Sequence, residues 1–95
     1  MKIIELEEGA FEGTIEGKIT ELEEPREITT KFGRRLKVAN GKIEDDSGSI
    51  KLALWNEDAE KYKEGDRIKI TNGYVSRFKD ELNVSAGRNG KIEKV

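Results

Sequence analysis

The chain lacks the residue types that most often carry out catalysis or bind metals. Its 95 residues include no cysteine and no histidine, which excludes disulfides, thiolate nucleophiles and zinc sites made of cysteine or imidazole. Histidine is also the usual general base at neutral pH. Carboxylates do cluster at residues 44–46, and we interpret them as a solvated hairpin turn in preference to a cation site. We therefore expect neither an enzyme nor a bound metal or cofactor.

Apolar residues are few and never form a long run. They make up 34% of the chain, against 40% for charged residues, and this balance alone would favour disorder. No run approaches the roughly 20 residues of a membrane-spanning helix, and the N-terminal MKIIELEEGA lacks the apolar stretch of a signal peptide. We expect a cytoplasmic monomer with no membrane association. A lysine- and glutamate-rich surface over a small core is also typical of thermostable proteins.

Charge is distributed unevenly along the chain, although the net charge is only −2. Residues 1–24 carry eight acidic and two basic side chains, whereas residues 26–42 carry one acidic and six basic side chains. A basic patch on an acidic body is suited to a phosphate backbone. The alternative is that these charges only keep a small domain soluble. The six basic residues are Arg26, Lys31, Arg34, Arg35, Lys37 and Lys42.

Short stretches of alternating apolar residues recur between turn signals, which predicts an all-β domain. We expect one domain over residues 1–95, with an acidic N-terminal segment at 1–10. A bulge is expected near Asn40–Gly41, where the apolar phase changes from Leu36 and Val38 to Ile43. Residues 56–63 favour a short helix that Asn56 caps. The predicted strands are residues 11–20 with a continuation at 26–29, then 36–44, 49–55, 67–78 and 81–86, with a short extended piece within 87–95.

This order of elements predicts a specific architecture. A helix between the third and fourth of five strands is typical of the five-stranded Greek-key barrel called the OB-fold. One sheet face and two flanking loops of that fold bind oligonucleotides.

Trp55 is the single tryptophan of the chain, and strand alternation places it on the solvent face and not on the core face, where a large apolar side chain is expected. In Ser49–Trp55, alternation places Ile50, Leu52 and Leu54 on the core face. Trp55 then shares the solvent face with Lys51 and Ala53, as a stacking site for nucleobases would require. The alternative is a half-buried indole that closes the barrel end or packs under the helix.

Tyr74 and Phe78 are the next candidates for base stacking. In an uninterrupted strand both rings would point inward, together with the side chains of Asn72 and Ser76. Burial of each polar side chain without a hydrogen-bond partner would cost about 1–3 kcal/mol. A bulge at Gly73 instead turns Val75 inward and both aromatic rings outward. We favour the bulge, which places three aromatic side chains on one outer surface.

Basic side chains lie beside aromatic ones in two predicted hairpins, as expected of a groove for single-stranded nucleic acid. In the hairpin between the fourth and fifth predicted strands, Arg77 and Lys79 flank Phe78. In the loop between the first and second predicted strands, Lys31, Arg34 and Arg35 surround Phe32. The alternative is that Phe32 serves only as a hydrophobic anchor for this loop. The basic candidates of the predicted site are Arg26, Lys31, Arg34, Arg35, Lys37, Lys51, Arg77, Lys79 and Arg88.

The chain resembles the OB-fold single-stranded DNA-binding domains of archaea, including those similar to replication protein A. The matching stretches are EGKITELEEPREITTKFGRRLKVA (16–39), EDDSGSIKLALWNE (44–57) and KEGDRIKITNGYVSRFKDELNVSAGRNGKIEKV (63–95). Together they carry D-x-S-G, a strand ending in tryptophan, a K-E-G-D turn and an N-G-aromatic sequence, and this combination is specific.

The resemblance implies single-stranded DNA binding by base stacking on Trp55, Tyr74 and Phe78, in DNA replication, repair or recombination and alongside protein partners. Relatives often have tryptophan in place of Tyr74, which implies a smaller stacking area here. Two alternatives stay open from the sequence. One is an OB-fold module for protein–protein interaction, and the other is an RNA- or tRNA-binding domain.

Overall fold

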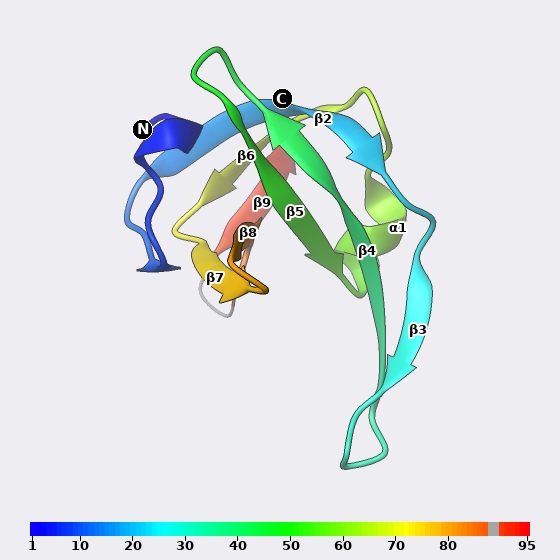
Figure 1. Ribbon diagram of the computed structural model, residues 1–95. Coiled ribbons are helices and arrows are strands. Elements are labelled where there is room, and N and C mark those ends of the chain that lie inside the picture. The colour runs from blue at the N-terminus through cyan, green and yellow to red at the C-terminus, as the bar shows by residue number, and fades with distance from the viewer. Residues whose placement is uncertain (88–89) are drawn as a thin grey trace.

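A single curled sheet forms the body of the protein in the computed structural model, which describes residues 1–87 and 90–95. The strand order is β1-β7-β8-β5-β4-β2-β6-β9, and β3 pairs with β4 outside this path. The only parallel pair among the described strands is β5 with β8, and it brings the two halves of the sheet together (Figure 1). The elements are η1 (Ile3–Glu5), β1 (Gly9–Ala10), β2 (Thr14–Leu22), β3 (Arg26–Thr29), β4 (Arg35–Glu44), β5 (Ser49–Trp55), α1 (Glu57–Lys61), β6 (Arg67–Thr71), β7 (Tyr74–Phe78), β8 (Glu81–Ser85) and β9 (Lys91–Lys94).

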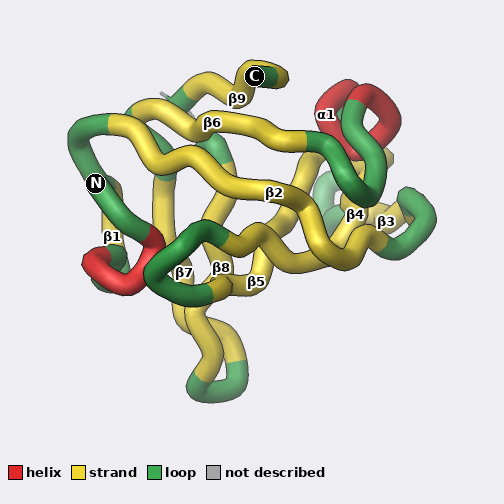
Figure 2. The backbone as a smooth tube through the Cα atoms, turned by 90° about the horizontal axis from the view of Figure 1, so that it is seen from above, coloured by secondary structure: helices red, strands yellow, loops and turns green. Residues whose placement is uncertain are grey.

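Alternating apolar residues build the core from the concave side of this sheet. Ile15 and Ile19 of β2 and Ile68 and Ile70 of β6 are fully buried, as strand alternation requires. The first predicted strand begins later than expected, because Phe11 is buried outside the regular ladder and its N–H donates to the Gly73 carbonyl at 3.1 Å. The all-β prediction is confirmed, and the short helix α1 follows β5 and precedes β6 in the chain, as expected. It lies at one end of the barrel, near β4 (Figure 2).

The strand count exceeds the predicted five, since nine strands are present among the described residues. Part of the difference arises because the chain breaks at Asn72–Gly73, which divides the predicted strand 67–78 into β6 and β7. Asn72 adopts a φ of +50°, a left-handed conformation that ends a strand. The other three additional strands are β3, which the sequence predicts as a continuation of the first strand, and the short edge strands β1 and β9.

The prediction of a bulge near Asn40–Gly41 is wrong. β4 pairs with β5 without interruption from Val38 to Glu44, and the register shift lies instead in β2, between Ile19 and Glu21. Val38 and Leu36 are therefore not core-facing residues. They lie on the outer face of β4, and Ala39 and Ile43 lie on the core face.

The helix is shorter than predicted, and Asn56 does not cap it through its side chain. Asn56 has a φ of +55°. Its Oδ1 accepts a hydrogen bond from the Lys37 N–H at 3.3 Å, and its own N–H donates to the Lys37 carbonyl at 2.8 Å. The Asn56 side chain therefore holds the end of β5 against β4, and only its backbone carbonyl serves the helix N-terminus, by accepting a hydrogen bond from the Ala59 N–H at 3.1 Å.

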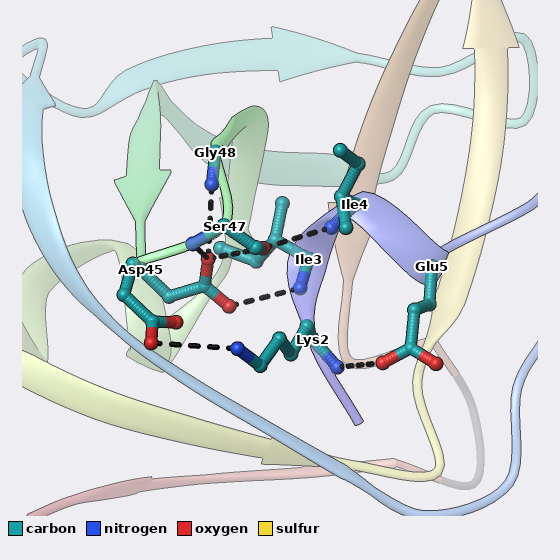
Figure 3. A network of polar contacts seen from close by, with 8 residues as sticks. Lys2, Ile3, Ile4, Glu5, Asp45, Ser47 and Gly48 are labelled. Carbon is teal, nitrogen blue, oxygen red and sulfur yellow. Dashed lines mark hydrogen bonds and ion pairs between the residues drawn. The ribbon is translucent and has the colours of Figure 1, made fainter.

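The acidic N-terminal segment packs on the barrel instead of extending from it. Ile3 and Leu6 are buried in the core cluster. The Ile3 N–H donates to Asp45 Oδ2 at 2.9 Å and the Ile4 N–H donates to Ser47 Oγ at 3.2 Å, both in the β4–β5 turn (Figure 3). This turn is the tight hairpin that the sequence predicts at residues 45–48.

Candidate nucleic-acid interface

The convex side of four neighbouring strands, β4, β5, β8 and β7, forms one continuous surface that we call the outer face. The ladder registers set its rows. One row runs Arg26–Val38–Trp55 across β3, β4 and β5. A second runs Lys42–Lys51–Asn83–Ser76 across β4, β5, β8 and β7. The side chains of β7 and β8 that share the outer face are Tyr74, Ser76, Phe78, Glu81, Asn83 and Ser85.

Trp55 occupies the last position of β5 and is exposed on the outer face, as predicted. Its residue exposure is 41%, whereas its neighbours Leu52 and Leu54 are buried on the opposite side. Val38 lies directly opposite it on β4. The indole is therefore half-exposed and is not buried beneath the helix. The alternative of a half-buried ring at the end of the barrel stays open, and stacking on Trp55 remains a prediction.

Tyr74 and Phe78 lie at the two ends of β7 on the same face. Their exposures are 46% and 66%, and Val75 between them is fully buried. The phase change predicted at Gly73 is confirmed. A Cβ atom at Gly73 would lie 2.5 Å from the Ser85 carbonyl oxygen, so the chain turns outward at a point where only glycine fits.

The Trp55 and Tyr74 rings flank the same segment of chain. The hollow beside Trp55 and the hollow beside Tyr74 share Ser85, Ala86 and Gly87 as lining residues. Because β5 and β8 are parallel and β7 pairs antiparallel with β8, Trp55 and Tyr74 lie toward one end of the outer face. Phe78 lies four residues from Tyr74, or about 13 Å along the strand.

Phe78 borders a second, polar groove at the other end of the outer face, which we call the Phe78 groove. It is lined mainly by charged and amide side chains, including Arg26, Lys42, Lys51, Glu81 and Asn83. Lys51 forms an ion pair with Glu81, and this hydrogen bond holds the pKa of the Glu81 carboxyl below its usual value. Lys79 in the adjoining turn places its Nζ 5.5 Å from the centroid of the Phe78 ring.

The β3–β4 loop carries another part of the predicted site, away from these rings. This hairpin extends well beyond the barrel in Figure 1. It is closed by hydrogen bonds from Thr30 N–H to the Arg34 carbonyl and from Gly33 N–H to the Thr30 carbonyl. Phe32 at the tip is 93% exposed. It does not pin the loop to the barrel, so that alternative is wrong, and Lys31 and Arg34 are exposed on either side of it.

Three predicted basic residues point to the opposite face from the aromatic rings. Arg77 alternates with Ser76 and Phe78 and pairs with Glu8 of the N-terminal segment at 3.8 Å. Lys37 forms an ion pair with Glu60 of α1, which raises the pKa of Lys37. Arg35 lies 3.6 Å from Glu27 of β3. The remaining candidate, Arg88, lies outside the described residues.

Four carboxylates of this surface were missed from the sequence. Glu21, Glu23 and Glu81 line the Phe78 groove. Asp58 lines the hollow beside Trp55, where burial raises the pKa of Asp58. Strand alternation would have placed Glu81 on the same face as Asn83. The position of Asp58 depends on how α1 returns over β5, for which no sequence signal exists.

No metal-binding cluster is found among residues 1–87 and 90–95. In the same part of the chain, no helix has the length and apolar character needed to cross a membrane.

Comparisons with known proteins converge on one kind of domain. A family model described as an OB-fold nucleic acid binding domain matches residues 13–92. The single-stranded DNA binding protein Ssb of Saccharolobus solfataricus is 36% identical over 79% of this chain and 50% of its own length. Replication factor A of Methanothermobacter thermautotrophicus is 37% identical over 96% of this chain and 11% of its own length.

A solved structure shows the same fold. The second OB-fold domain of replication protein A from Methanococcus maripaludis superimposes with a TM-score of 0.80 at 30% identity, covering 100% of this chain and 95% of that domain. The chain thus spans half the length of one curated relative and about a tenth of the other.

Proposed function

The chain belongs to the family of OB-fold nucleic acid binding domains, and on this basis we propose that it binds single-stranded DNA on the outer face of its barrel. The observation that carries the proposal is the exposure of Trp55, Tyr74 and Phe78 on one sheet face. Curated relatives named for single-stranded DNA binding and for replication support the same assignment. The proposed role is in DNA replication, repair or recombination, by binding and not by catalysis.

Stacking supplies the affinity in this mechanism. Each base that stacks on an exposed aromatic ring contributes about 1–3 kcal/mol with little dependence on sequence. Trp55 and Tyr74 flank the end of β8, and Phe78 lies farther along β7. Successive bases of one strand would therefore cross the outer face from the Trp55 hollow to the Phe78 groove.

Basic side chains beside the rings hold the phosphates. Arg26 and Lys51 line the Phe78 groove, and Lys79 lies over the Phe78 ring. Lys31 and Arg34 flank Phe32 on the projecting β3–β4 loop, and we propose that this loop closes over the bound strand. Arg35, Lys37 and Arg77 lie on other surfaces and are not part of the interface that we propose.

The intrinsic fluorescence of Trp55 tests this proposal directly, because it is the only indole of the chain. The protein is titrated with an oligothymidine of about 16 nucleotides, the upper site size of one OB-fold, at low and at high salt. We expect saturable quenching at low salt that reverses as salt rises, since bound counterions compete for the phosphates.

Two variants and one competitor oligonucleotide make the result specific. Tyr74→Ala should weaken binding and leave the Trp55 signal intact, whereas Arg77→Ala should not change binding. An oligouridine of the same length, used as a competitor, measures the preference for DNA over RNA. If the folded protein shows no quenching at low salt, the outer face does not bind single strands and the assignment fails.

A further inference from the structure

Glu81 lies directly opposite Phe78 in the β7–β8 ladder. Side chains opposite each other in an antiparallel ladder have Cβ atoms about 4.5–5.5 Å apart. The Glu81 side chain is 55% exposed and the Phe78 residue is 66% exposed. A base that stacked on the Phe78 ring would thus have one of its edges beside the Glu81 carboxylate.

The Glu81 carboxylate has only part of its hydrogen-bonding capacity in use. Lys51 Nζ contacts Oε2, and no other donor side chain contacts this carboxylate among residues 1–87 and 90–95. An ionised carboxylate accepts only, at about four lone-pair positions. Oε1 is therefore available to a donor on a ligand while Lys51 remains paired and offsets the negative charge.

From this juxtaposition we propose that Glu81 selects the base that stacks on Phe78, favouring bases with an exocyclic amino group over uracil and thymine. The inference rests on the proposed function and deepens it. The amino group at position 4 of cytosine donates to a carboxylate, whereas the carbonyl oxygen at the same position of uracil or thymine is repelled by it. Adenine presents an equivalent amino group. Stacking stays tolerant of sequence, and Glu81 adds a preference at one position.

The test compares two oligonucleotides whose bases differ at two neighbouring positions. Cytosine has an amino group at position 4 and an acceptor nitrogen at position 3, whereas uracil has a carbonyl oxygen and an N–H there. Oligodeoxycytidylate and oligodeoxyuridylate of equal length are titrated at pH 8, where the ring nitrogen of cytosine is unprotonated, and Trp55 quenching is measured. The protein should bind the cytidylate more tightly by about tenfold or more, as expected for one hydrogen bond to a charged group. Glu81→Gln should lower this ratio to about one or below, because the amide also donates to the uracil carbonyl.

Glu16→Gln is the matched control. Glu16 is a half-exposed carboxylate that pairs with Arg67 at 3.9 Å, on β2 and away from the aromatic rings. The Glu16→Gln substitution removes the same charge and should leave the ratio of the two affinities unchanged. The proposal is overturned if Glu81→Gln keeps the ratio of the parent protein, or if it tightens both oligomers equally, which would make Glu81 only a repulsive charge. Absence of quenching with either oligomer would overturn the proposed function as well.

Discussion

Val38 lies directly opposite Trp55 across the β4–β5 ladder, on the outer face of the sheet. It is only 6% exposed, although it does not belong to the buried core cluster formed by the described residues. Arg26 flanks it on the other side, in the β3–β4 ladder. We infer two roles for Trp55: it helps to cover Val38, its direct cross-strand neighbour, and its exposed part is the stacking surface that we propose.

Replacing Trp55 should separate these two roles. We expect Trp55→Ala to weaken binding of single-stranded DNA by about 1–3 kcal/mol, since one stacked base is lost. The free energy of unfolding should fall by only about 0.2–1 kcal/mol, the usual value of a cross-strand pair. Fluorescence anisotropy of a labelled oligothymidine measures the first quantity, and urea denaturation followed by circular dichroism measures the second. Trp55→Phe should retain most of the affinity, and a loss as large as that of Trp55→Ala would contradict the stacking mechanism.

The end of β7 and the turn that follows it offer a matched pair of basic residues, Arg77 and Lys79. Lys79 lies over the Phe78 ring, whereas Arg77 points to the opposite face and pairs with Glu8. We expect Lys79→Ala to reduce the slope of log affinity against log salt by about 0.7, the value for one phosphate contact with a single strand. Arg77→Ala should leave the slope unchanged. Equal slopes for the two variants would mean that Lys79 does not contact a phosphate.

Much of the fold was predictable because alternation is strong in the strands that carry it. β3 and β5 begin and end at the predicted residues. The error at β4 has a physical cause: Val38 is buried on the outer face, opposite Trp55, and does not belong to the core cluster. An apolar residue covered in this way has the same signature in sequence as a core residue, so the pattern suggested a phase change that does not exist.

The site was predictable in its aromatic part and less so in its basic part. The exposure of Trp55, Tyr74 and Phe78 follows from alternation and from one break at Gly73. A count of basic residues, however, says nothing of which face each one occupies. Lys37 reaches Glu60 on the helix, and only the fold brings those two residues together.

Gly41 permits the close approach of β4 to β2 at the register shift. A Cβ atom built there would lie 2.1 Å from the backbone carbonyl oxygen of Glu21. We expect Gly41→Ala to lower the free energy of unfolding by about 1–3 kcal/mol or more, as overpacking does. Gly48→Ala is the control, since nothing lies within 4 Å of a Cβ at that position. Thermal unfolding of both variants checks this, and equal midpoints would contradict it.

The β4–β5 turn makes the stability of the protein depend on pH through Asp45. Partial burial acts to raise its pKa, but hydrogen bonds donated by Ser47, Ile3 and Gly48 outweigh that effect, so the pKa lies below the usual value (Figure 3). The Ser47 and Gly48 N–H groups reach Oδ1 at 2.7 and 3.1 Å. Because the folded-state pKa is depressed, the carboxylate stabilises the fold above the unfolded-state pKa of about 3.9. This stabilisation is lost as the pH falls through the folded-state pKa.

Asp45→Asn should therefore be less stable than the parent protein at pH 7, by about 1–2 kcal/mol for the weakened charged hydrogen bonds. The difference should shrink as the pH falls below about 4, where the parent carboxyl is itself protonated. Asp46→Asn is the control: its exposed carboxylate pairs with Lys2 at 3.4 Å, and such surface pairs contribute about 0–1 kcal/mol. Unfolding curves between pH 2.5 and 7, a range chosen around the carboxyl pKa of about 3.9, measure both differences. A gap for Asp45→Asn that stays constant over this range would show that the ionised carboxylate does not hold the N-terminal segment on the turn.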